Sequence, residues 1–369
     1  MKYQPYNNFW QRLHSSAKNK GFPLRVMFEL TYQCNFNCKH CYVPKSYRKI
    51  RELKTKEVFS VLDELKKIGC FYLGFTGGEP FVRKDIMQIL WYAKRKGFEI
   101  IIYTNGSLID KTAAKELKRI RVNKVDITIP AMSKPAFERI SGVSGSWEKV
   151  FAAINFLREN KVPLGFKTCV LKENESEIKG IQDFARSLGA LHRLDDMLSR
   201  RLDGSEEPFK YRGTIAKCRT SSHSECSPQG EAKNPDDKIL RSAVGLPQND
   251  GNGTYESISV NSRLFECGVG VSQAAITPLG ELKPCLMIDS PRFRILREKR
   301  GQSADFKVAW LQLKKFVSAI APDENYNCNK CKLQTYCKWC PARSWLYNKN
   351  FTSCEPESRK NARNSIQNF

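Results

Sequence analysis

No apolar run in the 369 residues is long enough to cross a bilayer. The N-terminal stretch MKYQPYNNFWQRLHSS lacks the continuous apolar core of a secretory signal. Basic residues form no block interleaved with aromatics, as they do in many nucleic-acid binders, and no repeat of the kind that builds a solenoid is present. These absences predict a cytoplasmic protein that does not span a membrane, and they argue against binding to nucleic acid.

The composition provides an apolar core and a large excess of positive charge. Apolar residues make up 41% and aromatic residues 11% of the chain, which is enough for one large domain and a smaller one. The 62 Lys and Arg residues outnumber the 38 Asp and Glu residues, for a formal net charge of +24. Such a field attracts anions and speeds encounters with acidic partners. The charge favours an acidic peptide or an acidic electron-transfer protein as a partner, unless it only solvates a lysine-rich surface.

The chain contains 14 cysteines, most of them in clusters. Structural disulfides are rare in a reducing compartment, so clustered thiols favour metal binding or catalysis there. Cys70 in KIGCFYLGF and Cys169 in GFKTCVLKEN are scattered and lie in apolar, strand-like surroundings. We interpret these two as core residues.

From residue 25 to about 198, short apolar runs alternate with amphipathic stretches. Six strands are predicted, within VMFELTY, FYLGFTG, EIIIYTNG, KVDITIP, LGFKTCVL and ALHRLDDML. Five helices are predicted between them, within TKEVFSVLDELKKIG, KDIMQILWYAKRKG, DKTAAKELKRI, WEKVFAAINFLREN and ENESEIKGIQDFARSLG. This alternation predicts an α/β fold with a parallel sheet, in the form of a partial (β/α)6 TIM-like barrel. In such barrels the chemistry lies at the C-terminal ends of the strands.

The composition along the chain predicts four parts. They are an N-terminal extension (1–23), the barrel (24–212), a polar linker or mobile segment rich in Ser, Gly, Asn and Pro (213–262), and a small, loop-rich cysteine-cluster domain (263–369).

Three cysteines crowd into CNFNCKHCYV, which begins at residue 34 after the first predicted strand. A disulfide, a zinc ion and an iron–sulfur cluster are the alternatives. Zinc usually takes four ligands, and His40 adjoins Cys41, which makes joint coordination of one ion awkward. Cys34, Cys38 and Cys41 on a tight loop suit a [4Fe–4S] cube with three irons held by the protein and a fourth open to a small ligand. This spacing after the first strand resembles the radical S-adenosylmethionine (SAM) enzymes.

The segment FTGGEP follows the second predicted strand. Gly77 and Gly78 allow a close approach of the backbone to a ligand, and Glu79 can pair with an ammonium group. Alone, Gly-Gly-Glu-Pro is simply a turn. At this position it resembles the element of radical SAM enzymes that holds the amino group of SAM.

Later strands carry further candidates by the same resemblance. Asn105 in YTNG lies where family members contact the cofactor, although Asn-Gly also forms turns. Thr168 in KTCVLKEN is a cofactor or structural candidate on the fifth strand. The fourth strand departs from the family, because relatives often read Ser-x-Asp where this chain has Thr128 and Pro130.

The C-terminal cysteines follow the pattern C-x12-G-x4-C, a gap, C-x2-C-x5-C-x2-C, a gap, and C. A zinc ribbon is an alternative for the CxxC pairs, but seven cysteines are awkward for one zinc ion. The order resembles the SPASM extension of radical SAM enzymes, which carries auxiliary iron–sulfur clusters. The resemblance implies two ligand sets, Cys267, Cys285 and Cys340 for a first cluster and Cys328, Cys331, Cys337 and Cys354 for a second. The first is one ligand short, and Cys218 or Cys226 would complete it unless the position stays open.

The segment LDDMLSRRLDGSEEPFKYR resembles a stretch that precedes the SPASM extension in many peptide-modifying members. Arg201 and Asp203 are therefore candidate substrate contacts at the mouth of the barrel. The competing interpretation is that Asp203 and Gly204 form a surface turn.

The resemblance covers nearly the whole chain and implies an enzyme. A reduced cluster would pass one electron to SAM, giving methionine and a 5′-deoxyadenosyl radical that removes hydrogen from the substrate. SPASM proteins most often modify a peptide or protein side chain, and a flavodoxin or ferredoxin is the expected acidic electron donor. Because only about two dozen residues precede the barrel, leader recognition would need a separate protein. The alternatives are oxidative decarboxylation of a tetrapyrrole and, in a different class, a non-catalytic iron–sulfur electron carrier or a zinc-stabilised scaffold.

Overall fold

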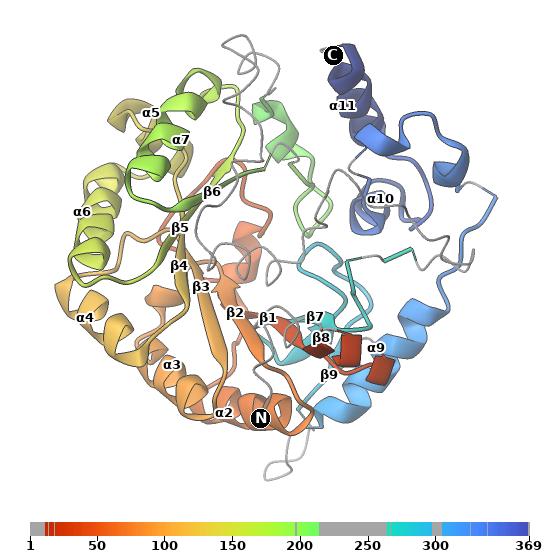
Figure 1. The fold of residues 1–369 in the computed structure, drawn as a ribbon, viewed down its shortest axis with the longest axis horizontal. Helices are drawn as coiled ribbons and strands as arrows, with labels where there is room; N and C mark the ends of the chain where they lie inside the picture. The colour runs from red at the N-terminus through yellow and green to blue at the C-terminus, as the bar shows by residue number, and fades with distance from the viewer. Residues whose placement is uncertain are drawn as a thin grey trace, which may run out of the picture.

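A computed structural model describes residues 12–213, 264–296 and 305–367, except for residues 14, 18, 196–197, 266, 325 and 338. Within this part of the chain, one sheet of nine strands has the order β6-β5-β4-β3-β2-β1-β7-β8-β9 (Figure 1). The strands are β1 (Arg25–Thr31), β2 (Tyr72–Gly77), β3 (Glu99–Thr104), β4 (Lys124–Thr128), β5 (Leu164–Cys169), β6 (Leu191–Asp195), β7 (Gln273–Ile276), β8 (Glu281–Lys283) and β9 (Phe293–Arg294). Neighbouring strands from β6 to β7 are parallel, and β8 and β9 are antiparallel to their neighbours.

Helices cover the outer face of the curved sheet (Figure 1). The α-helices are α2 (Thr55–Lys67), α3 (Ile86–Arg95), α4 (Lys111–Ile120), α5 (Lys134–Ser141), α6 (Ser146–Glu159), α7 (Ile178–Ser187), α9 (Phe306–Ser318), α10 (Pro341–Asn348) and α11 (Pro356–Gln367). Short 3-10 helices are η1 (Lys45–Lys49), η2 (Pro80–Val82), η3 (Glu175–Glu177), η4 (Glu207–Tyr211), η6 (Cys328–Lys330) and η7 (Gln334–Tyr336). All six predicted strands and all five predicted helices are present, and the partial (β/α)6 barrel is confirmed.

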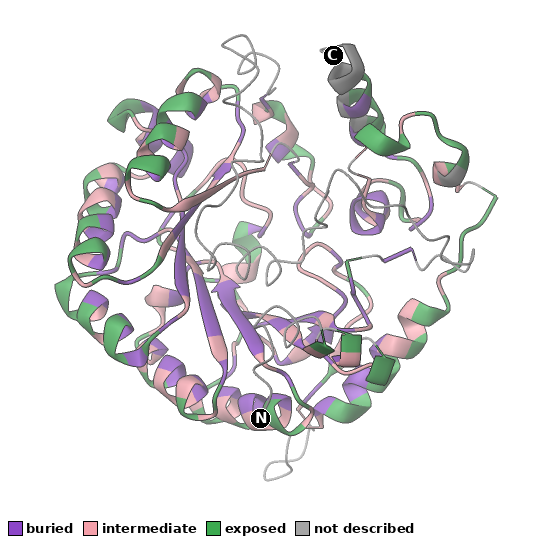
Figure 2. Cartoon of the chain, in the orientation of Figure 1, coloured by how far each residue is buried: buried purple, intermediate pink, exposed green. Residues whose placement is uncertain are grey.

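The amphipathic pattern of the helices explains why they lie on the sheet. In α4, the residues Ala114, Leu117 and Ile120 recur every three positions and are buried, whereas the lysines between them are exposed. The helix begins at Asp110, whose side chain accepts a hydrogen bond of 2.7 Å from the amide of Ala113. Figure 2 shows the same division on the outer helices, with exposed residues outside and buried residues toward the sheet.

The two faces of the sheet differ in polarity. Phe28, Phe75 and Ile102 are neighbours in register and are completely buried among the apolar residues of the helical face. The opposite face, which lines the interior of the barrel, carries the buried charged residues Glu29 and Asp126. A charge on a buried strand must find a partner or a ligand, so the barrel interior is where polar function is to be sought.

The sheet does not end with the barrel strands. β7 pairs in parallel with β1, from Arg25 opposite Gln273 to Phe28 opposite Ile276. Residues 273–294 therefore extend the barrel sheet on the side away from β2, and α9 contacts β8, β9 and α2. Apart from Gly213, the predicted linker 213–262 lies outside the described residues. No described helix combines the length and apolarity that a membrane span requires.

Candidate functional site

The three N-terminal cysteines lie on the loop that follows β1, at the C-terminal edge of the parallel strands. The C-terminal end of α5 fastens this loop, because the amides of Asn37 and Lys39 donate to the carbonyls of Ser141 and Ile140 at 2.8 and 3.2 Å. The amide of Cys41 donates to the carbonyl of Cys38 at 3.2 Å. Backbone hydrogen bonds to α5 and within the loop therefore hold the cysteine loop in this conformation.

Burial makes these thiols poor acids. It raises the pKa of Cys34 to about 11, and it raises the pKa of Cys38 well above its usual value. The charges of Cys41 and Cys34 also raise the pKa of Cys38, so the three thiols are near enough to interact. Thiolates at these positions therefore need a positive centre to stabilise them, and binding of a metal centre would release protons.

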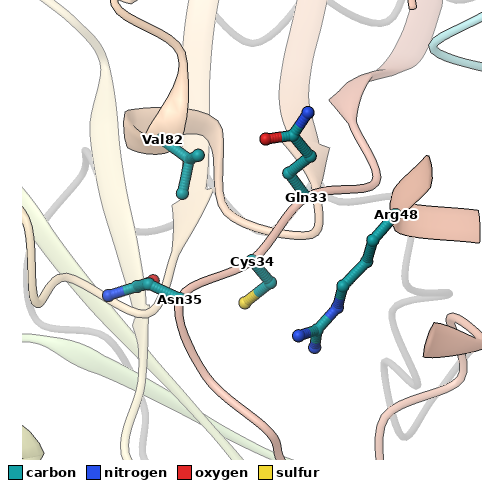
Figure 3. A pocket seen from close by; sticks show the side chains of 5 residues that line it. All are labelled: Gln33, Cys34, Asn35, Arg48 and Val82. Carbon is teal, nitrogen blue, oxygen red and sulfur yellow. The ribbon is translucent and has the colours of Figure 1, made fainter. Parts of the chain in front are cut away.

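A pocket of about 320 Å³ opens beside Cys34 and is lined by Gln33, Cys34, Asn35, Arg48 and Val82. Figure 3 shows Cys34 between Asn35 and Arg48 at this pocket. The Arg48 guanidinium donates to the Phe36 carbonyl at 2.7 Å and to the Asn37 side chain at 3.0 Å, and its charge lowers the pKa of Cys34. The sequence does not single out Arg48, because nothing in KSYRK distinguishes one basic residue from the others.

The two glycines of FTGGEP serve a close contact with the cysteine loop. Gly77 has a φ of +136°, and a Cβ there would lie 2.1 Å from the carbonyl oxygen of Thr31. A Cβ on Gly78 would lie 2.2 Å from the carbonyl oxygen of Gln33. The amides of Gly78 and Glu79 donate to these same carbonyls at 2.7 and 2.8 Å. We expected a close approach to a ligand, and the structure shows a close approach to the segment that leads into Cys34.

Glu79 joins FTGGEP to the YTNG segment that follows β3. Its carboxylate is completely buried and accepts hydrogen bonds from the Thr104 hydroxyl at 2.7 Å and the Phe81 amide at 3.0 Å through Oε1, and from the Asn105 amide at 2.7 Å through Oε2. Burial raises the pKa of Glu79 to about 7, although these three hydrogen bonds favour the charged form. In this structure Glu79 therefore holds the YTNG segment against FTGGEP.

Asn105 completes the link back to the cysteines. Its side-chain amide donates to the Asn35 side chain at 2.9 Å and lies 3.9 Å from the sulfur of Cys34. Cys34, Glu79 and Asn105 are thus brought together at the ends of three neighbouring strands, as the positions of their motifs predicted.

The candidate on the fifth strand, Thr168, and the nearby Asn174 are both completely buried. The Thr168 hydroxyl donates to the Ile129 carbonyl at 2.7 Å and contacts His192 Nε2 at 2.9 Å. The side-chain amide of Asn174 donates to the carbonyls of Pro130 and Cys169 at 2.7 and 2.9 Å. Both residues tie the fourth and fifth strands together.

The scattered cysteines differ from one another. Cys70 is 2% exposed, as expected of a core residue. Cys169 is only partly buried and ends β5, next to an ion pair of 3.0 Å between Lys167 and Asp195. Its charge interacts with that of Cys41, so it lies closer to the cysteine loop than its apolar neighbours suggested.

Arg201 and Asp203 have different positions. Arg201 is 9% exposed and forms an ion pair of 2.8 Å with Glu207. Burial raises the pKa of Cys41, and the positive charge of Arg201 offsets part of that rise. Leu202 donates its amide to the Tyr42 carbonyl at 2.9 Å, which places this segment against the cysteine loop. Asp203 is exposed and accepts from the Ser205 amide at 3.0 Å in a turn.

Residues 28–185 match the family model of the radical SAM superfamily. The chain carries a radical SAM domain. The protein is therefore an enzyme of the radical SAM type, and the cofactors of that superfamily are a [4Fe–4S] cluster and SAM.

Some similar proteins match nearly the whole chain, and others match about half of it. An AdoMet-dependent heme synthase from Methanosarcina barkeri is 25% identical over 350 residues, which cover 90% of this chain and 95% of that protein. A PqqA peptide cyclase from Gluconobacter oxydans is 29% identical over 169 residues, 46% of this chain and 47% of that protein. The structure of Streptococcus suis SuiB bound to its precursor peptide SuiA matches 97% of this chain and 82% of that chain with a TM-score of 0.64 and 16% identity. At that identity the structural likeness shows the fold.

The residues of the radical SAM domain suit its cofactors. Three thiols on one loop interact with one another, and Cys34 lines the pocket. The charge of Arg48 favours the thiolate form of Cys34. Gly77 and Gly78 allow FTGGEP to lie against the segment before Cys34, and the buried carboxylate of Glu79 holds YTNG at the same edge of the sheet. This donor set matches what a cube with one open corner requires.

The C-terminal cysteines after the radical SAM domain gather in two groups. Burial and the charges of Cys354, Cys337 and Cys331 raise the pKa of Cys328 to about 11, so these four thiols are neighbours. Burial raises the pKa of Cys285 to about 12, and the charge of Cys340 adds to the effect.

The other candidate ligands of the first auxiliary cluster are Cys267, Cys218 and Cys226. Cys267 is exposed, and the other two lie outside the described residues. Among the described side chains, no three His, Cys, Asp or Glu residues converge on a single metal ion. A cube offers separate iron corners, so its ligands do not have to meet at one point.

Proposed function

We propose that the protein is a radical SAM/SPASM enzyme that abstracts hydrogen from a peptide or protein side chain. The observation that carries the proposal is the junction at the ends of β1, β2 and β3, where three thiols, FTGGEP and YTNG are fastened to one another beside a pocket. An electron carrier or a zinc scaffold has no need of such a second and third segment around its thiols.

In this proposal Cys34, Cys38 and Cys41 hold the [4Fe–4S] cluster, and Gly77, Gly78, Glu79, Asn105 and Thr168 form the SAM site. A [4Fe–4S] cluster and SAM held by these residues would supply the reducing electron and the group that abstracts hydrogen from the substrate. The chain's own contributions are orientation and charge. Glu79 fixes YTNG through the Asn105 amide, and Arg48 supplies a positive charge beside the thiolates.

Two auxiliary clusters follow from the C-terminal cysteines. We assign Cys328, Cys331, Cys337 and Cys354 to one, supported by their mutual proximity. Cys267, Cys285 and Cys340 would hold the other, supported by the proximity of Cys285 and Cys340. These residues belong to a SPASM domain that we place at 263–369, after the barrel at 24–212 and the linker at 213–262.

A peptide or protein substrate is supported by the likeness to SuiB bound to its precursor peptide and to the PqqA peptide cyclase. Arg201 and Asp203, on the segment packed against the cysteine loop, are proposed substrate contacts. A separate protein would supply leader recognition where the substrate has a leader. The net charge of +24 supports an acidic electron donor such as flavodoxin or ferredoxin, and clustered thiols support work in the cytoplasm.

A tetrapyrrole is the second candidate substrate. The likeness to AdoMet-dependent heme synthase spans 90% of this chain, whereas the likeness to PqqA peptide cyclase spans 46%. In that case the reaction would be an oxidative decarboxylation of a porphyrin side chain.

The test is anoxic reconstitution with iron and sulfide, followed by dithionite and SAM. Release of 5′-deoxyadenosine and binding of about twelve iron atoms per chain are expected for three cubes. The Cys38→Ala variant should lose the cleavage, whereas Cys70→Ala, at a buried thiol outside both groups, should retain it. Wild-type protein with a full cluster and no cleavage of SAM would overturn the proposal. Incubation with peptides or with an iron coproporphyrin, read by mass spectrometry, then separates the two substrate classes.

A further inference from the structure

A completely buried ion pair lies between the radical SAM domain and the C-terminal segment. Glu29 on β1 and Lys283 on β8 are both 0% exposed, and Lys283 Nζ lies 2.9 Å from Glu29 Oε2. β7 separates their two strands in the sheet. The pair therefore reaches across an intervening strand.

The register of the sheet explains how the lysine crosses β7. Met27 is opposite Ala275, and Ala275 is opposite Lys283, so these three residues lie in one row. Glu29 is two residues beyond Met27 and points to the same face. Because Ala275 has a small side chain, the lysine can pass over β7 toward Glu29.

Each partner also holds a residue next to a proposed cluster ligand. Tyr42 follows Cys41, and its hydroxyl donates to Glu29 Oε1 at 3.0 Å. Leu286 follows Cys285, and its carbonyl accepts from Lys283 Nζ at 3.2 Å. A single connected set of contacts thus runs from one cysteine loop to the other through two buried charges.

A buried ion pair of this kind contributes little to the free energy of unfolding. Charges lose their hydration, and replacement of a buried pair by apolar residues of similar volume is often neutral or stabilising. The attested use of buried charges is to fix one arrangement among several. This pair would fix the arrangement of two loops, each of which carries proposed cluster ligands.

We propose that Glu29 and Lys283 are positioning residues that set the separation of the SAM-binding cluster from the first auxiliary cluster. The inference rests on the proposed function, since it needs both clusters. The pair acts through Tyr42 at one end and the Leu286 carbonyl at the other, so that the ligands Cys41 and Cys285 keep a fixed spacing.

The test measures magnetic coupling between the clusters in the full-length reconstituted protein. After reduction with dithionite, both clusters are paramagnetic, and pulsed EPR of the SAM-binding cluster reports how a nearby spin speeds its relaxation. The double variant Glu29→Met/Lys283→Met removes both charges and keeps apolar volume. We expect the wild-type iron content and stability to urea, together with a loss of the fast relaxation.

Three further variants sharpen the result. Lys283→Arg keeps the charge and should keep the fast relaxation. Tyr42→Phe removes only the hydrogen bond to Glu29 and should slow the relaxation, which also tests the inference if the double variant fails to fold. Lys94→Met breaks an ion pair with Glu99 at the opposite ends of the strands and is the matched control.

The possible failures are distinguishable. Fast relaxation that persists in both the double variant and Tyr42→Phe would overturn the inference and leave the proposed function intact. Wild-type protein that binds only about four iron atoms would overturn the auxiliary clusters of the proposed function, and the inference with them.

Discussion

The buried carboxylate of Glu79 makes the stability of the protein depend on pH in an unusual direction. Its pKa is about 7 in the folded chain and 4.5 in a solvated one, because burial disfavours the charge more than the three hydrogen bonds favour it. The folded state therefore binds a proton more tightly than the unfolded state between these values. The stabilisation is complete below about pH 4.5 and is lost as the pH rises through about 7.

The magnitude follows from the shift. A difference of about 2.5 pKa units at about 1.36 kcal/mol each is worth roughly 3 kcal/mol. The side-chain amide of a Glu79→Gln variant does not titrate. It also places its nitrogen against the Asn105 amide, which costs about 1–3 kcal/mol through a lost hydrogen bond at every pH. Only the change with pH therefore tests the reasoning.

The assay is urea unfolding of the metal-free, reduced protein at several values from pH 4.5 to 8, with linear extrapolation to water. The free energy of unfolding of the wild type minus that of Glu79→Gln should fall by about 3 kcal/mol over this range. Glu159→Gln, which removes an exposed carboxylate on α6, is the matched control. If this difference between wild type and Glu79→Gln stays constant, the account of Glu79 is wrong.

Three other substitutions test contacts at the C-terminal edge of the barrel strands. Gly77→Ala should cost about 1–3 kcal/mol in backbone strain alone and lower the iron bound after reconstitution, since its Cβ meets a carbonyl; unchanged iron and urea midpoint would refute this. Asn174→Ala leaves three buried backbone groups without their side-chain partner, so the free energy of unfolding should fall by about 3 kcal/mol in thermal unfolding. A loss under about 1 kcal/mol would contradict the role of this side chain. Arg48→Met removes a charge that lowers the pKa of Cys34 and Cys41, so alkylation of these thiols in apoprotein should shift to higher pH. An unshifted profile would show that Arg48 does not act on them.

The barrel could be predicted because its strands are buried on both faces or pack against helices. Such strands read as apolar runs, and the helices between them show regular apolar spacing. The same reasoning located the cysteine loop, FTGGEP and YTNG at one edge, since all three follow parallel strands. Because the C-terminal ends of parallel strands lie at one edge of a sheet, segments that follow such strands can be placed near one another from the sequence alone.

Other parts of the fold depend on contacts that the sequence does not display. β7 has only four residues, and its pairing with β1 joins positions about 250 residues apart, so local pattern gives no register. α5 has eight residues and was missed between a strand and a longer helix. α9 was also missed, although Phe306, Ala309, Trp310 and Leu313 follow a helical spacing that would have revealed it.

The site shows the same limit. Glu29 stands out as the charged residue of the apolar stretch VMFELTY, and burial of that strand implies that the charge has a partner. Lys283 is that partner, and no local feature of ELKPC identifies it. Likewise, the glycines of FTGGEP signalled a close approach, but only the structure shows that the approaching group is the backbone of Thr31 and Gln33.

The position of β1 within the sheet has a consequence for synthesis of the chain. Its neighbour on one side is β2, which emerges from the ribosome soon afterwards, but its neighbour on the other side is β7, which begins at Gln273. Until then, one row of backbone amides and carbonyls on β1 has no strand partner, next to the thiols of the first cysteine loop. Nascent protein is therefore most prone to edge-to-edge association, and its cysteines to oxidation, during the interval before β7 is made.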